Sequence, residues 1–260
     1  IKTIYCGHAI HGAITKDTDN IFYEAFHEVL LHSPYDKEIM TQENEYKGFN
    51  LNVTGFPRNQ AMLENIINIT RLKNNNNLNG RKVILYAPTG NRNNIDYIES
   101  EFSISNINFI KFIRDTLSNS DIVLIIKNHI NDDISKEIKE IANDCNNILF
   151  QHELKLDFDY DSLLISDVLI TDFSTIYVDY LLLDKPIYII SNPDPDPQRK
   201  MSSILSDIEL PILESKKELV SMIEKLKYDQ LENSKIKKLK NKIYQDHNHQ
   251  ETIDKILKKI

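Results

Sequence analysis

Four short apolar runs, separated by segments long enough for helices, constrain the fold of this chain more than any other feature. All are rich in β-branched residues, and they are Val83–Tyr86, Ile122–Ile126, Val168–Ile170 and Ile187–Ile190. Continuous rather than alternating apolar residues are typical of strands covered on both faces, as in parallel sheets. The pattern therefore predicts a parallel, doubly wound α/β domain from about residue 81 onward.

An earlier set of strand candidates predicts a second α/β unit before this domain. These candidates are Thr3–Cys6, Val29–His32 and Leu51–Thr54. We expect residues 1–69 to form the end of a first Rossmann-like domain. Because the chain begins at Ile1 rather than at Met, and a strand candidate follows almost at once, we also expect an upstream segment to be missing.

Residues 70–80 are polar, rich in asparagine and closed by Gly80. Asparagine and glycine favour turns over helices and strands, so this segment predicts a linker between the two domains. A surface loop with the same composition is the open alternative. Residues 81–233 then form the second domain, and 234–260 form C-terminal helices.

Composition excludes several classes of protein. The formal charge of −8 argues against general nucleic-acid binding. Cys6 and Cys145 stand at unrelated positions, which predicts neither a disulfide framework nor a zinc site and fits a reducing compartment. No apolar run is long enough to span a bilayer, and no signal peptide is visible, so we expect a cytoplasmic protein.

The stretch from Ser166 to Asp179 predicts a phosphate site. It reads as a buried strand, a turn with Asp172, Ser174 and Thr175, and a helix that starts on those hydroxyls. Free backbone N–H groups and hydroxyls at the positive end of a helix dipole hold phosphates well. This turn indicates a phosphorylated or nucleotide-linked substrate. Asp179 is interpreted equally well as a ligand contact or as a structural cap.

Two histidines, His11 and His129, each end a strand-like run at a loop. In a doubly wound sheet such loops lie at the carboxyl edge, where ligands bind. The loop after the first strand of the second domain adds Thr89 beside a glycine, and Arg92, which suits an anion. The other histidines are interpreted as structural or surface residues, or as part of a polar turn without a third metal ligand: His27, His32, His152, His247 and His249.

Five motifs in order give the chain a family resemblance. They are His11-Gly12-Ala13 followed by Lys16, Thr54–Asn59 with Arg58, Ile84–Thr89, Ile126–His129, and Asp167–Thr175 continuing to Asp179 and Lys185-Pro186. The chain resembles the CDP-glycerol glycerophosphotransferases, which are teichoic-acid primases and polymerases and related capsule enzymes. The resemblance implies an α/β, GT-B-like fold of two Rossmann-like domains, the first incomplete in this chain. It also implies that the last helices cross back to the first domain.

The same resemblance implies roles for the candidate residues. A glycerol hydroxyl must lose a proton as it attacks phosphorus, and CMP must leave with added negative charge; imidazole suits the first task near neutrality. His11 would be the general base, with Gly12, Lys16 and Arg58 in acceptor-side or structural motifs. The donor phosphates would be bound by His129, Lys127, Thr89, Arg92, Ser174 and Thr175, with Asp172 and Asp179 orienting the donors or contacting glycerol.

Several alternatives stay open at the level of sequence. Residues 192–200 depart from the family pattern, so we expect the donor to be CDP-glycerol or another CDP-alditol such as CDP-ribitol. The expected acceptor is a lipid-linked polyol phosphate or glycan. A GT-B glycosyltransferase that uses a nucleotide sugar and a non-catalytic assembly subunit are the rivals. No cofactor is implied, no metal ligands are assigned, and dependence on a divalent cation stays open. The lysine-rich segment after Ser234 predicts either a solvated helix face or a peripheral contact with anionic lipid at the inner membrane face.

Overall fold

The computed structural model describes residues 3–6, 27–42, 50–88, 102, 106–128, 134–172, 174–190 and 210–259. The chain divides into two compact units. The first unit contains the described residues up to Ile66 together with those from Ser234 onward, and the second contains the rest. Among the described residues, no helix is both long and apolar enough to cross a membrane.

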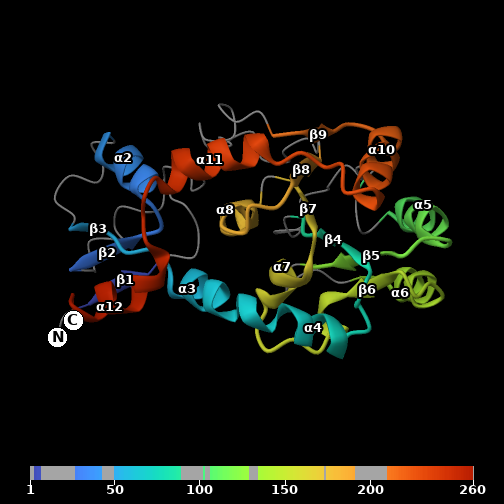
Figure 1. Ribbon diagram of the computed structural model, residues 1–260, viewed down its shortest axis with the longest axis horizontal. Coiled ribbons are helices and arrows are strands. Elements are labelled where there is room, and N and C mark those ends of the chain that lie inside the picture. Colours follow the sequence, from blue (N-terminus) through green and yellow to red (C-terminus); the bar gives the residue numbers. More distant parts are fainter. Residues whose placement is uncertain are drawn as a thin grey trace. The chain divides into compact units, whose positions relative to one another are not determined.

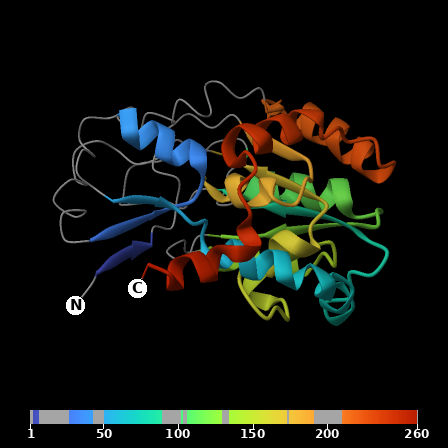
Figure 2. The same cartoon turned by 60° about the vertical axis from the view of Figure 1, so that its left-hand side comes forward.

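The first unit holds a three-stranded parallel sheet in the order β1-β2-β3. Its strands are β1 (Ile4–Cys6), β2 (Glu28–Leu31) and β3 (Leu51–Val53). Figure 2 shows α2 (Pro34–Gln42) running across this sheet, and Met40 of α2 packs with Val29 and Leu31. The three predicted strands are therefore confirmed, each with ends within a residue or so of the expected bounds.

The remaining described elements of the first unit come from distant parts of the sequence. They are α3 (Pro57–Glu64), the start of the 3-10 turn η3 (Asn65–Asn68), α11 (Ser234–Tyr244), the 3-10 turn η5 (His249–Glu251) and α12 (Thr252–Leu257). The last three belong to the segment that the sequence predicts to return to the first domain. Their apolar residues are used in packing, as with Ile236, Leu239 and Ile243 of α11.

The second unit contains a six-stranded parallel sheet in the order β6-β5-β4-β7-β8-β9. Its strands are β4 (Lys82–Tyr86), β5 (Ile122–Ile126), β6 (Ile148–Phe150), β7 (Val168–Thr171), β8 (Ile187–Ile190) and β9 (Ile212–Leu213). Numbered within the unit, this order is 3-2-1-4-5-6, the Rossmann arrangement. The four predicted strands are confirmed. The sequence analysis missed β6 and β9, which are only three and two residues long.

Helices cover both faces of this sheet (Figure 1). One face carries α5 (Ile107–Leu117), α6 (Lys136–Asn143) and α10 (Lys216–Lys227). The other carries α4 (Ile69–Asn75), α7 (Asp161–Ile165) and α8 (Ile176–Leu181), with the 3-10 turn η4 (Gln151–Glu153) after β6. Ile84 and Tyr86 of β4 face the first layer, and Val83 and Leu85, which alternate with them, are also fully buried. Burial of alternate residues on both faces explains the continuous apolar runs.

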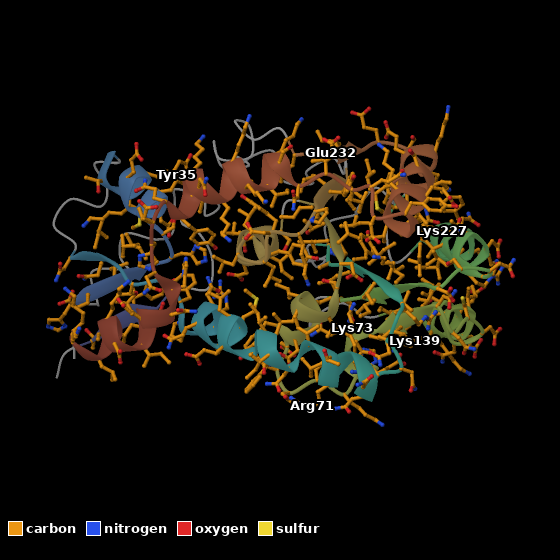
Figure 3. All side chains as sticks on the ribbon, viewed as in Figure 1. Tyr35, Arg71, Lys73, Lys139, Lys227 and Glu232 are labelled. Atoms are coloured by element: carbon orange, nitrogen blue, oxygen red, sulfur yellow. The ribbon has the colours of Figure 1, made fainter. Side chains whose placement is uncertain are left out.

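The segment for which the sequence predicts a linker is folded onto the second unit. Leu72 of α4 and Leu78 after it are fully buried. Arg71 forms an ion pair with Asp157, and Lys73 Nζ lies 3.3 Å from Asp167 Oδ2. The side chains of Arg71 and Lys73 both project from α4 (Figure 3). Because the segment is mostly asparagine, its sequence pattern did not indicate that these two leucines are buried. A turn through Gly80, with a φ of 70°, follows the helix.

Candidate functional site

The turn that follows β7 lies at the switch point of the second sheet. In the Rossmann order successive strands are added on one side of β4 up to β6 and then on its other side from β7 onward, and ligands bind outside the carboxyl ends of β4 and β7. The two strand ends are tied together, because Ala87 N–H donates to Ile170 O at 2.9 Å and Thr171 Oγ1 donates to Ala87 O at 2.6 Å. The phosphate-binding turn predicted from the sequence therefore begins at a strand end that is held by hydrogen bonds to its neighbour.

Asp172 gives this turn its shape. Its side chain is 2% exposed, and Oδ1 accepts the backbone N–H of Ser174 at 3.0 Å. An Asp that binds the backbone two residues ahead makes an Asx turn, which stabilises the bend without help from elsewhere in the fold. Asp172 also contributes to raising the pKa of the Tyr86 hydroxyl, although burial of that hydroxyl is the larger cause. Asp172 thus supports the turn rather than projecting into solvent.

Helix α8 begins directly after this turn, as the sequence predicts, but its start differs in detail. Thr175 is the N-cap residue, and its side chain makes no capping hydrogen bond. Its backbone is helical, with φ −68° and ψ −4°, whereas a capping side chain needs an extended backbone to reach the amides of the first turn. The expectation that the helix starts on the hydroxyl of Thr175 is therefore wrong. Asp179 lies in the first turn of α8 and is half-buried.

Lys127 lies at the same edge of the sheet. It follows β5, and its backbone N–H donates to Tyr86 O at 2.9 Å, so it sits beside the end of β4. Burial lowers the pKa of its ammonium group, and Asp159 partly opposes this effect. The structure therefore brings Lys127, Asp172, Ser174 and Thr175 to the ends of β5 and β7, the two strands that flank β4. Thr89, Arg92 and His129 lie outside the described residues.

Lys185 belongs to the family-like motifs but has a structural environment. Its Nζ donates to Leu164 O at 2.7 Å and to Ser166 O at 2.6 Å, at the end of α7. Burial lowers the pKa of this ammonium group to about 8, while Asp167 opposes the shift. The lysine therefore binds helix-end carbonyls, which are favourable partners for a cation.

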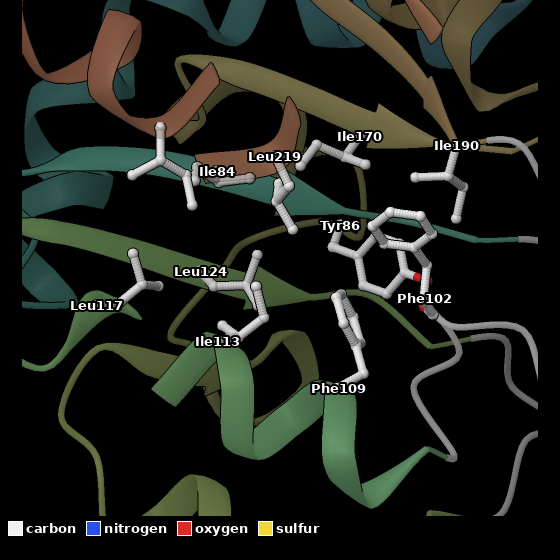
Figure 4. Close-up of a pocket in the computed structure, with 11 residues that line it drawn as sticks. Ile84, Tyr86, Phe102, Phe109, Ile113, Leu117, Leu124, Ile170, Ile190 and Leu219 are labelled. Atoms are coloured by element: carbon white, nitrogen blue, oxygen red, sulfur yellow. The ribbon is translucent and has the colours of Figure 1, made fainter. Parts of the chain in front are cut away.

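An apolar pocket in the second unit is part of its core and not a ligand site. Figure 4 shows Ile84, Leu124 and Ile170 from the strands converging with Phe109 and Ile113 of α5. The Tyr86 hydroxyl donates to the carbonyl of Phe102, which satisfies the polar group that reaches this pocket. A nucleotide finds no polar partner there.

The first unit presents its own strand-to-helix turn, Thr54–Arg58, after β3. Gly55 adopts a φ of +79°, which favours glycine, and Pro57 stands at the first helical position of α3. The Arg58 guanidinium lies 4.6 Å from the centre of the Phe56 ring. His11, Gly12 and Lys16 lie outside the described residues.

The sequence analysis did not predict that three histidines lie close together next to this turn. His32 Nε2 lies 2.8 Å from Asn59 Nδ2 and 3.1 Å from the Tyr244 hydroxyl. The ring centre of His32 is 6.2 Å from that of His249, which is 4.8 Å from that of His247. The sequence analysis had assigned these three residues to structural or polar-turn positions one by one. No group of metal-ligating residues is found within the described part of the chain.

Comparison with known proteins gives a consistent result. The family described as CDP-glycerol:poly(glycerophosphate) glycerophosphotransferase matches residues 13–260. A teichoic acid poly(glycerol phosphate) polymerase of Bacillus spizizenii is 30% identical over 82% of this chain and 55% of its own length. A teichoic acid poly(ribitol-phosphate) polymerase of the same organism is 26% identical over 76% of this chain and 33% of its own length.

Among solved structures, the wall teichoic acid polymerase TagF is similar with a TM-score of 0.66 and 18% identity, over 95% of this chain and 64% of that chain. This likeness confirms the α/β, GT-B-like fold class expected from sequence. The chain spans about half the length of the poly(glycerol phosphate) polymerase that it matches.

Proposed function

Because this chain belongs to the CDP-glycerol:poly(glycerophosphate) glycerophosphotransferase family, we propose that it transfers glycerol phosphate from CDP-glycerol to a hydroxyl of a teichoic-acid-like acceptor and releases CMP. The observation that carries this proposal is the Asp172–Thr175 turn at the switch point between β4 and β7. Such a position suits the diphosphate of a CDP-linked donor.

The described residues supply binding and electrostatic stabilisation. The hydroxyls of Ser174 and Thr175 and the backbone amides at the start of α8 would hold the diphosphate, and Lys127 would offset the charge that develops on departing CMP. The turn is fixed by Asp172 and by the hydrogen bond from Thr171 to Ala87. Its hydrogen-bonding groups are therefore held in place before the CDP-linked substrate binds. His11 would remove the proton of the acceptor hydroxyl, and His129 would assist CMP as it leaves.

The identity of the alditol is the first point to test. The similarity to a poly(ribitol-phosphate) polymerase keeps CDP-ribitol as an alternative donor. The decisive experiment measures CMP release by the full-length protein from CDP-glycerol and, in parallel, from CDP-ribitol, with a lipid-linked glycerophosphate acceptor. Acceptor-dependent release that is lost in His11→Ala and in His129→Ala is the expected result. His152→Ala, which changes an exposed histidine stacked on Phe150, is the matched control.

Two outcomes would overturn the proposal. If neither CDP-alditol is consumed but a nucleotide sugar is, the protein is a glycosyltransferase on the same fold. If the nucleotide binds to the wild type and to both histidine variants but no CMP is released, it is a non-catalytic subunit.

The acceptor and its surroundings are anionic, and α11 offers a surface of matching charge. This helix carries five lysines and no acidic residue, and Lys235, Lys237, Lys238 and Lys242 are exposed. Its apolar residues Ile236, Leu239, Ile243 and Tyr244 are all buried, so it keeps no apolar face for insertion into lipid. We therefore propose that α11 contacts phosphate groups of the polymer acceptor, or lipid headgroups at a membrane surface, by charge alone.

A further inference from the structure

The C-terminal segment of the first unit packs directly on the backbone of Gly55. A Cβ atom at Gly55 would lie 2.8 Å from Thr252 Oγ1, 2.9 Å from His249 Nδ1 and 3.2 Å from His247 Nε2. These distances leave no room for a side chain. Residues almost 200 positions away in the chain therefore define the space around the turn after β3.

Further contacts hold the same two segments together. The backbone N–H of Ile253 donates to Gln60 Oε1 at 2.8 Å, which joins the start of α12 to α3. The Tyr244 hydroxyl lies 3.1 Å from His32 Nε2, and its ring meets His249 edge-on at 4.6 Å between centres. Helix α3 and the end of β2 are thus both tied to the C-terminal segment.

Three histidine side chains, His32, His247 and His249, contribute to the contact between these segments. His32 is 1% exposed and His249 is 5% exposed. Burial is the main cause that lowers the pKa of His247, and neighbouring Lys255 and His32 lower it further. A positive charge on His247 would lose hydration in this contact and would be repelled by Lys255. The contact therefore favours the neutral form of the His247 ring.

Few charged groups surround the cluster in the described part of the chain. Glu251, on the segment itself, and the backbone of Thr54 act to raise the pKa of His247, but these effects are smaller than that of burial. From α2, Asp36 accepts the backbone N–H of His32 at 3.3 Å. From α3, Arg58 stacks on Phe56, whose ring centre lies 4.9 Å from that of His32. The nearby cation Lys255 adds to the cost of protonating His247.

We propose that residues 247–252 form a clamp that positions the Thr54–Arg58 turn, and that protonation of His247 loosens it. His32, His247 and His249 are positioning residues in this proposal, because they act through the turn and not on the reacting atoms. Its catalytic consequence rests on the proposed function, in which this turn belongs to the acceptor side. A loosened clamp would then weaken acceptor binding and leave donor binding in the second unit unchanged.

The direction of the pH effect follows from linkage. An unfolded or undocked histidine titrates near pH 6.5, whereas docking lowers the pKa of His247. The undocked state therefore binds more protons as the pH falls below about 6.5, and the docked state is favoured above that pH. The clamp is expected to be closed near neutrality and to open in mild acid.

The first test needs no enzymatic activity. Hydrogen–deuterium exchange, corrected for the intrinsic pH dependence, is followed in peptides covering residues 50–60 between about pH 7.5 and about pH 5.5. Exchange is expected to rise about tenfold over this range, while peptides of β4 and β5 stay protected. In His247→Gln/His249→Gln the rise should shrink at least threefold, and His152→Gln should match the wild type. A turn whose protection in the wild type does not respond to pH overturns the proposal.

The second test separates the clamp from the proposed function. With active full-length protein, the acceptor KM should rise about tenfold from pH 7.5 to pH 5.5 and the KM for CDP-glycerol should stay within about twofold. If exchange responds to pH but the acceptor KM does not, the positioning role is wrong. If no CMP is released under any condition, the proposed function fails, and the exchange experiment alone decides whether the clamp exists.

Discussion

The two strand-to-helix turns of this protein differ in what packs on them. At the turn after β7, Asp172 accepts the N–H of Ser174, and Thr171 is bonded to the end of the adjacent strand. The turn after β3 is also bonded to its adjacent strand, through Leu31 O, but the far end of the chain packs on it as well, through Thr252, His249 and His247. We therefore expect the turn after β3 to respond to changes in the C-terminal segment.

Substitution of Gly55 should have the largest effect. In Gly55→Ala, the new Cβ meets Thr252 Oγ1 and also forces a positive φ on alanine, so we expect a loss of about 3 kcal/mol in the free energy of unfolding. Urea denaturation measures it. Gly80→Ala is the control, because Gly80 has a similar φ of 70° but a Cβ added there would meet nothing within 4 Å. This substitution should cost about 1 kcal/mol. Equal losses in the two variants would show that the C-terminal contact is not tight.

Removal of the Asp172 carboxylate should come next. Asp172→Ala leaves the Ser174 amide without its acceptor at a partly buried position, and we expect a loss of about 2 kcal/mol together with weaker binding of CDP-glycerol. Calorimetry of donor binding and thermal unfolding check both effects. Asp172→Asn keeps an oxygen acceptor and should lose less than half as much. Full donor affinity in Asp172→Ala would remove this turn from the donor site.

Two tyrosines in the two units form a matched pair. Tyr244→Phe removes the hydroxyl beside His32, and Tyr180→Phe removes the hydroxyl that accepts from Ser166 at 3.1 Å. Each should cost about 1 kcal/mol, the usual net value of a buried hydrogen bond. Only Tyr244→Phe should increase hydrogen exchange in residues 50–60. If Tyr180→Phe does so to the same degree, the exchange reports global stability and not the clamp.

Charge reversal on α11 should change stability least. Lys235→Glu/Lys237→Glu/Lys238→Glu alters exposed side chains, so the free energy of unfolding should shift by less than about 0.5 kcal/mol per site. The acceptor KM should nevertheless rise, and its salt dependence should weaken. The same reversal at the exposed Lys217, Lys225 and Lys227 of α10 serves as the control. An unchanged acceptor KM in the α11 variant would leave this helix as a solvated surface.

Sequence patterns predicted most of the second unit, because its information is local. The apolar runs of β4, β5, β7 and β8 record burial on both faces, and the Asp172–Thr175 turn follows from residues that are adjacent in the chain. Errors arose where the pattern was too short or was masked by composition. β6 and β9 contain too few residues to show a period, and the asparagines of 70–80 obscured Leu72 and Leu78.

By itself, the sequence determined the α/β class, the order of the strands along the chain and the residue types available for phosphate chemistry. Only the tertiary structure decided that β4 and β7 are neighbours and that His32, Tyr244 and His249 meet behind Gly55. The reason is physical. Periodicity records how one residue is buried relative to its close neighbours, whereas contacts across 200 residues depend on which faces of separate elements pack together.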